Sequence, residues 1–520
     1  MNYPVWDVAL GAGLLVALVA ILHVFVSHFA VGGGLFLVLT ERKARRQADA
    51  ALLGWLKLHT RFFVLVTVVF GAVSGVGIWF TIGLVNPVAT SNLIHAYVWG
   101  WAIEWIFFFL EITAALLYLY GWETLPPRLH QWYGWIYFGA AFASMVIING
   151  IITFMLTPGA WVDDHQFWSG FFNPTFFPSL GLRFVVALAL AGVYALITAS
   201  VQKDSLLKAR IVRWSAGWTA PALAVVPAFG WWYIRALPAA VWASVGGPMP
   251  TATRFALPAT LLLVVTFLLV LFAWIRPARL HLAFSLLVAL AALGAMGSFE
   301  FVREAIRKPY VIGNYLYGNS LYVSPMPGDG GFTVDKINEV GVLKAAKWLE
   351  LRELTRENEL AVGREIFRVE CASCHTTDAY RGVRKYLAMR QWGRDNIQAM
   401  LGSLDLLHNG AMPPFAGRDA ERGALAGFLN ALAPQIPSGA GIADGKVVFE
   451  RYCGVCHQAT LDDPLFAGLP QDPREAGKAL TNLPSLFIRM PNLRLSDAER
   501  AALLGWINAR RGASPAGGGK

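Results

Sequence analysis

Cysteine and charge are both scarce in this chain. Of its 520 residues only four are cysteines, and all four fall in two Cys-x-x-Cys-His units, Cys371–His375 and Cys453–His457. This pattern excludes a disulfide framework. Charged residues make up 15% of the chain and hydrophobic residues 56%. That balance excludes an ordinary soluble protein and indicates a membrane protein.

The excess of basic residues lies in loops and does not form a nucleic-acid-binding patch. The formal net charge is +10. Arg128 and the segments "ERKARRQ", "QKDSLLKARIVR" and "IRPARLH" alternate along the chain with "NPVATSN" and "PGAWVDDHQFWSGFFNP", which contain no Lys or Arg. Loops rich in Lys and Arg stay in the cytoplasm. No nucleic-acid partner is therefore predicted.

Eight apolar runs reach the length of about 18 residues that crossing a bilayer requires. They lie near residues 7–40, 59–86, 93–121, 130–156, 174–200, 216–235, 254–275 and 279–303. The first run has no cleavage site, so we expect it to remain as a membrane helix. With basic loops inside, both the N-terminus and the C-terminal third lie outside. We expect a bacterial inner membrane protein with both ends in the periplasm.

The C-terminal third contains an internal repeat. We expect a membrane domain over residues 1–310, a linker and connecting helix over 311–355, and two small α-helical domains over 356–437 and 438–515. Each of the two small domains has a helix, a CxxCH unit, a Met-Pro and an amphipathic helix. The predicted fold is thus all-α, with about eight transmembrane helices followed by two domains that resemble small class I cytochrome c domains.

The CxxCH units predict covalent c-type haem, with two thioether bonds and an axial histidine at each. A pair of zinc sites is the alternative. A methionine completes the coordination of an electron-transferring haem. Met389 is a rival to Met412 as the second axial ligand of the first haem. The predicted residues are Cys371, Cys374, His375 and Met412 for the first haem, and Cys453, Cys456, His457 and Met490 for the second.

Ionisable residues interrupt the membrane runs. Burying such a residue in a membrane is costly, so we expect each of them to have a function. His23 and His28 lie in "HVFVSHFAVGGG", about 140° apart around a helix. Glycines 32–34 would let a macrocycle or another helix approach. Glu104 and Glu111 share one helix face, as do Glu300 and Glu304. Paired buried carboxylates suit proton uptake or the modulation of a bound ligand.

Three segments of the membrane part resemble subunit I of cytochrome bd oxygen reductases. They are "ILHVFVSHFAVGGGLFLVLTE", "WAIEWIFFFLEIT" and "EAIRKPYVIG". The resemblance implies that His23 and Glu304 are haem ligands, and that Glu104, Glu111 and Arg307 serve catalysis. The residue that corresponds to Glu300 is not acidic in the family. Glu300 could compete as a ligand, carry protons, or join His28 at a non-haem metal.

The departures from the family pattern concern the low-spin haem b that receives electrons from quinol. Its family ligands, a histidine and a methionine, correspond to Val186 and Ala256, which cannot bind iron. The long quinol-binding loop is reduced to "ALPAAVWASVGGPMPTAT". We therefore expect this haem to be absent and electrons to enter from the c-type domains.

The sequence thus predicts an oxygen reductase of the bd type that reduces oxygen to water. Its expected cofactors are two covalent haems c and two non-covalent haems of b or d type. Expected partners are a membrane subunit similar to subunit II and a soluble cytochrome c or another donor. Nitric oxide reduction on the same scaffold, and a non-catalytic conduit between the quinone pool and cytochrome c, remain alternatives.

Overall fold

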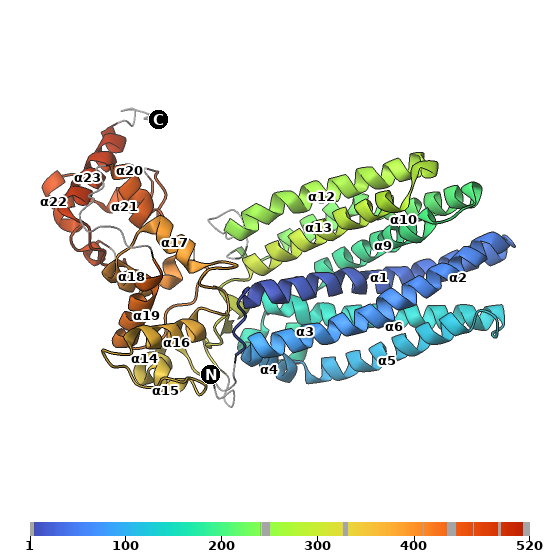
Figure 1. The fold of residues 1–520 in the computed structure, drawn as a ribbon, viewed down its shortest axis with the longest axis horizontal. Coiled ribbons are helices and arrows are strands. Elements are labelled where there is room, and N and C mark those ends of the chain that lie inside the picture. Colours follow the sequence, from blue (N-terminus) through green and yellow to red (C-terminus); the bar gives the residue numbers. More distant parts are fainter. Residues whose placement is uncertain are drawn as a thin grey trace. The chain divides into compact units, whose positions relative to one another are not determined.

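The computed structural model describes residues 5–239, 241, 250–325, 331–408, 410–433, 444–460, 462–486 and 490–512. They fold almost entirely into helices (Figure 1), and the strands found among them are β1 (Tyr310–Ile312) and β2 (Leu316–Tyr317). The predicted all-α class is therefore confirmed. The chain divides into two compact units, and the predicted domain boundaries stay predictions.

The first unit comprises residues 15–307 and 311–314 and is called the membrane unit below. It is a bundle of long helices joined by short loops (Figure 1). Its elements are α1 (Ala12–Arg46), α2 (Ala50–Val64), a π-helical stretch η1 (Leu65–Phe70), α3 (Gly71–Val85), α4 (Pro87–Ala96), α5 (Val98–Tyr120), α6 (Pro127–Leu156), α7 (Trp161–Asp164), α8 (Phe167–Phe171), α9 (Phe176–Ser200), α10 (Ser205–Arg235), α12 (Pro250–Ile275), η2 (Pro277–Arg279) and α13 (Leu282–Ile306).

Seven helical stretches of the described chain are long and apolar enough to cross a membrane, and they correspond to seven of the eight predicted spans. They are Ala12–Arg46, Ala50–Val85, Val98–Tyr120, Pro127–Leu156, Phe176–Ser200, Arg254–Ile275 and Leu282–Ile306. The eighth predicted span, 216–235, lies in α10. That helix is interrupted by Pro221 and Pro227 and begins with a charged segment, which lowers its apolar character.

Helix α10 nevertheless lies antiparallel along the whole of α9. At the connecting turn, Lys208 donates a hydrogen bond to the Ser200 carbonyl at 3.1 Å. Towards the other end, a Cβ added at Gly181 would lie 2.4 Å from the Phe229 ring. The predicted span 216–235 is therefore helical and packed within the bundle, beside a helix of membrane-spanning length.

The glycine run in α1 allows close packing against other helices. A Cβ added at Gly32 would lie 1.9 Å from the Ala187 carbonyl oxygen of α9, and one at Gly34 would lie 2.5 Å from the Tyr137 ring of α6. The neighbouring Phe29 ring stacks on Tyr194 of α9, with centroids 3.9 Å apart. Of the two predicted reasons for the glycines, the structure supports the approach of another helix.

The second unit, called the C-terminal unit, comprises residues 1–14, 308–310 and 315–520. Its helical elements after the strands are α14 (Val334–Val340), α15 (Val342–Ala345), α16 (Glu359–Glu370), α17 (Val383–Arg390), α18 (Arg394–Leu401), η3 (Leu404–Leu406), α19 (Asp419–Leu432), α20 (Gly445–Val448), a π-helical stretch η4 (Phe449–Cys453), α21 (Pro464–Gly468), α22 (Pro473–Ala479), η5 (Leu483–Ser485) and α23 (Asp497–Gly512).

The same helix crossing occurs twice in the C-terminal unit. In the first half, a Cβ added at Gly363 of α16 would lie 2.2 Å from the Ala424 carbonyl oxygen of α19. In the second half, a Cβ at Gly445 of α20 would lie 2.1 Å from the Ala502 carbonyl oxygen of α23. Each half thus packs its first helix against its last at a glycine. This agrees with the repeat seen in the sequence.

Candidate functional site

His23 lies on the face of α1 that contacts α3. Its Nδ1 is 3.1 Å from the Ser74 hydroxyl oxygen, and its ring passes so close to Gly75 that an added Cβ would lie 3.1 Å from Cε1. The Ser74 hydroxyl donates its own proton to the Phe70 carbonyl at 2.8 Å. The hydroxyl oxygen must therefore accept from Nδ1–H of His23. The lone pair on Nε2 is left for another group, as in an axial haem ligand.

Glu304 and Arg307 lie at the end of α13. Arg307 donates to the Glu304 carboxylate at 2.6 Å and to the Val311 carbonyl at 2.6 Å. The Glu304 side chain keeps 39% of its surface exposed, whereas Arg307 is buried. The Nε of Arg307 is a buried donor with no hydrogen-bond partner among the described residues. A buried donor of this kind fits an anionic group such as a haem propionate.

His28 belongs to a buried polar cluster that gathers four helices. It lies within electrostatic range of Arg183 on α9 and Glu300 on α13, and Arg183 is in turn within range of Tyr233 on α10. Glu300 forms an ion pair with Arg303 at 2.8 Å. Sequence reasoning missed Arg183 and Arg303. A charge inside an apolar run was the signal that could have found them.

The tautomer of His28 is determined by its own helix. Nδ1 lies 2.8 Å from the Val24 carbonyl, which can only accept, so Nδ1 carries the proton and Nε2 the lone pair. A metal held by His28 and Glu300 would have to displace Arg303. No group of three His, Cys, Asp or Glu residues in the described part of the chain could hold a metal ion.

Glu104 and Glu111 both contact α6. Their spacing predicted that they share one face of their helix. Ser144 donates to Glu104 at 3.0 Å, and the Tyr137 hydroxyl donates to Glu111 at 2.9 Å. The Tyr137 oxygen also lies 3.2 Å from the Ala30 carbonyl of α1. The two carboxylates are therefore linked through α6 towards the helix that carries His23.

Another buried carboxylate, Glu41, lies near the C-terminal end of α1. Tyr118 of α5 donates to it at 2.8 Å, and His130 of α6 contacts it at 2.9 Å. Arg45, one helical turn further along α1, forms an ion pair with Glu41 at 2.5 Å. Glu41 is fully buried with its hydrogen bonds satisfied, so it joins three helices and has a structural role.

The first CxxCH unit follows directly after α16. His375 closes one helical turn by donating its backbone N–H to the Cys371 carbonyl at 2.9 Å. Its Nδ1 donates to the Arg381 carbonyl at 3.2 Å, which leaves Nε2 for iron. Burial lowers the pKa of His375 to about 4, so the ring stays neutral and able to bind a metal.

The second CxxCH unit begins in η4. His457 Nδ1 lies 2.7 Å from the Asp463 carboxylate, whose other oxygen accepts from the Gln458 backbone at 2.7 Å. A carboxylate that orients a histidine is a common arrangement behind a metal ligand, and it again leaves Nε2 for iron. Asp463 is a functional residue that sequence reasoning missed. All four cysteines are free thiols, as covalent haem attachment requires.

The methionines differ in burial. Met412 and Met490 are partly buried and pack against the core of the C-terminal unit, whereas the Met389 side chain is 65% exposed. A haem ligand must lie in the apolar haem pocket. This favours Met412 over Met389 as the second ligand of the first haem.

The two halves of the C-terminal unit meet beside the second CxxCH unit. The backbone N–H of His408 lies 3.4 Å from the Val455 carbonyl, inside that unit. The Trp392 indole donates to the Arg451 carbonyl at 3.0 Å. His408 also lies within electrostatic range of His375. The structure therefore brings the two predicted haem attachment sites close together.

Two family models match parts of the chain. Residues 12–238 match the family of cytochrome bd terminal oxidase subunit I. The membrane part of this chain is thus similar to cytochrome bd subunit I. Residues 358–429 match cytochrome c oxidase, cbb3-type, subunit III. The resemblance predicted from the sequence is thereby confirmed, and the two matches support a membrane oxidoreductase of electron transfer.

Part of the chain also has a fold similar to that of a solved bd oxidase. The bd oxidase from Geobacillus thermodenitrificans superposes with a TM-score of 0.52 and 15% sequence identity, over 59% of this chain and 89% of that one. No curated protein matches the chain. Of the two residues predicted to stand in place of the ligands of the low-spin haem, Val186 packs against the apolar core and Ala256 is exposed.

Proposed function

We propose that this chain is a membrane-bound oxygen reductase of the bd type that receives electrons through its own two c-type haems. The ligand pattern is the observation that carries the proposal. His23 keeps its Nε2 lone pair for iron at one end of the bundle. Val186 and Ala256 stand where a low-spin haem, the usual acceptor from quinol, would need ligands.

The geometry of the C-terminal unit supports the entry of electrons there. His375 and His457 each donate Nδ1–H to an oxygen atom that holds the ring in place. When bound, the c haems supply one-electron transfer, and a haem with an open iron position supplies the binding of a diatomic substrate. The proposed cofactors are two covalent c haems and two non-covalent haems of b or d type.

Side chains of the membrane unit have distinct proposed roles. Glu304 is the protein ligand of a second membrane haem, and Arg307 positions it through the ion pair at 2.6 Å. Glu104 and Glu111 hold and pass on protons towards α1, since Tyr137 connects Glu111 to the Ala30 carbonyl. His28 and Glu300 belong to the buried ion-pair cluster with Arg303.

The proposed location follows from the charge of the loops, and the proposed partners follow from the resemblance to the bd family. The basic loops lie on the cytoplasmic side of a bacterial inner membrane, which places the N-terminus and the c-type domains in the periplasm. A soluble cytochrome c or another periplasmic donor reduces the c haems. A membrane subunit similar to subunit II accompanies the chain, and oxygen is the substrate.

The test is a haem count combined with turnover by the purified full-length protein. Extraction followed by pyridine haemochrome spectra is expected to show two covalent and two extractable haems. The reduced protein is expected to bind carbon monoxide and to consume oxygen with reduced cytochrome c but not with quinol. His23→Ala should remove the carbon monoxide signal and leave the c-haem spectrum intact.

The matched control is His95→Ala, since His95 is exposed at the end of α4 and donates to the carbonyl of its own helix at Ser91. It should change neither signal. Absence of any carbon monoxide signal would indicate an electron conduit instead. Turnover with nitric oxide in place of oxygen would indicate a nitric oxide reductase, and quinol oxidation would contradict the argument from Val186 and Ala256.

A further inference from the structure

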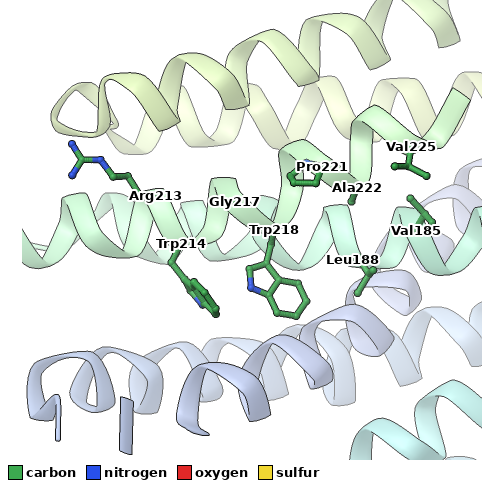
Figure 2. A pocket seen from close by; sticks show the side chains of 9 residues that line it. All are labelled: Val185, Leu188, Arg213, Trp214, Gly217, Trp218, Pro221, Ala222 and Val225. Carbon is green, nitrogen blue, oxygen red and sulfur yellow. The ribbon is translucent and has the colours of Figure 1, made fainter. Parts of the chain in front are cut away.

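A groove lies between α9 and α10, away from the sites described above. It has a volume of about 450 Å³ and is lined mainly by apolar side chains (Figure 2). Its lining comprises Val185, Leu188, Arg213, Trp214, Gly217, Trp218, Pro221, Ala222 and Val225. Trp214 of this lining donates to Thr40 of α1 at 2.9 Å. Thr40 is about 26 Å along α1 from His23, so this end of the groove is separate from the proposed haem ligand.

The groove follows one row of α10 in which Gly217 has no side chain. Arg213, Gly217, Pro221 and Val225 are spaced four residues apart and follow one another along the helix. No atom lies within 4 Å of a Cβ added at Gly217. From Arg213 to Val225 the helix rises about 18 Å, close to the roughly 15 Å of one leaflet of the hydrocarbon core. The groove can therefore hold one extended acyl chain.

The end of the groove nearest the basic loops is positively charged. Figure 2 shows Arg213 at one end of the lining, Val225 at the other, and Trp214 and Trp218 between them. Arg213 is exposed and forms no ion pair or hydrogen bond with another described residue, whereas the nearby Arg210 is paired with Asp49.

A second cation lies beside the same indole ring. The Lys43 ammonium sits 3.7 Å from the centre of the Trp214 ring. Indole rings are typical of the membrane interface, and a guanidinium group matches the geometry of a phosphate. Basic pockets between transmembrane helices on the cytoplasmic side bind the headgroups of anionic lipids.

We propose that this groove binds an anionic phospholipid, with its phosphate on Arg213 and one acyl chain along Gly217, Pro221 and Val225. The charge selects the headgroup, because a quinone or an apolar partner helix has no need of an unpaired guanidinium. The proposal does not depend on the proposed function, since it uses none of the haem-site residues.

The test is native mass spectrometry of the purified full-length chain, titrated with phosphatidylglycerol and with phosphatidylcholine of the same acyl chains. The wild type is expected to retain phosphatidylglycerol more tightly. Arg213→Gln should weaken phosphatidylglycerol binding about fivefold, the size expected for one basic side chain at a membrane surface, and leave phosphatidylcholine unchanged. Arg128→Gln is the control, an exposed arginine at the start of α6.

A second variant keeps the proposal testable by filling the groove. Gly217→Leu places a side chain in open space, so it should fold normally and displace both lipids. Equal binding of the two lipids, unaffected by Arg213→Gln, would overturn the proposal. So would a co-purifying quinone, or a partner subunit, whose retention falls with Gly217→Leu but not with Arg213→Gln.

Discussion

The contact between α1 and α9 at Gly32 predicts that a single methyl group will damage the bundle. In Gly32→Ala the new Cβ would lie 1.9 Å from the Ala187 carbonyl oxygen and 2.3 Å from its carbon. Ordinary van der Waals contact begins at 3.4 Å, so the helices would have to separate by the difference, 3.4 − 1.9 = 1.5 Å. Backbone atoms of two helices face each other here, and no flexible side chain can move aside.

The expected cost follows from two opposing effects. Overpacking a core typically costs about 1–3 kcal/mol. Replacing glycine by alanine in a helix where the methyl group has room stabilises it by about 0.5–1 kcal/mol. Gly54 of α2 has no atom within 4 Å of an added Cβ, so Gly54→Ala isolates the second effect. The propensity gain is common to both variants, so their free energies of unfolding should differ by the overpacking cost alone, about 1–3 kcal/mol.

Thermal denaturation of the two variants in the same detergent measures the difference, and the amount of extractable haem gives a second reading. Gly32→Ala should unfold at a lower temperature than wild type and lose non-covalent haem, because α1 also carries His23. Gly54→Ala should unfold at the wild-type temperature or slightly above it. Equal midpoints for Gly32→Ala and Gly54→Ala would refute the close contact of α1 with α9.

Three further predictions concern the C-terminal unit. Met412→Ala should remove the thioether-to-iron absorption of the first c haem and lower its potential; if Met389→Ala does so instead, the assignment is wrong. Asp463→Asn should raise the potential of the second c haem in a redox titration, because a neutral amide makes His457 a weaker donor, and an unchanged potential would count against this role. Burial raises the pKa of Glu370 to about 8 from its usual 4.5, so the folded state keeps a proton that the unfolded state loses. Stability should therefore fall by roughly 1.4 kcal/mol per pH unit as pH rises through that window, and melting curves of Glu370→Gln should lack this slope.

Much of the site could be predicted because it depends on spacing within one helix or one turn. Glu104 and Glu111 were predicted to share a face, and both meet hydroxyl groups of α6. The angle between His23 and His28 was also predictable, since His23 contacts α3 while His28 faces α9 and α13. Spacing along a helix decides direction, and the helical repeat is the same in every context.

The partners of these residues were not predictable in the same way. Glu300 was considered as a metal ligand or proton carrier, yet it is paired with Arg303 and lies near Arg183. The span in α10 was expected from apolar character alone, whereas its place in the bundle depends on antiparallel packing against α9. Membrane helices are apolar on most faces, so their pattern does not indicate which helix lies opposite.

The sequence by itself determined the class of protein and its apolar runs, and it predicted the two haem-attachment units and the loss of ligands at Val186 and Ala256. Each of these depends on the chemistry of residues close together in the chain. Only the tertiary structure decided which nitrogen of His23 is kept for iron, because Ser74 comes from another helix. It also decided that Gly217 leaves a groove, since a missing side chain matters only where no neighbour fills the space.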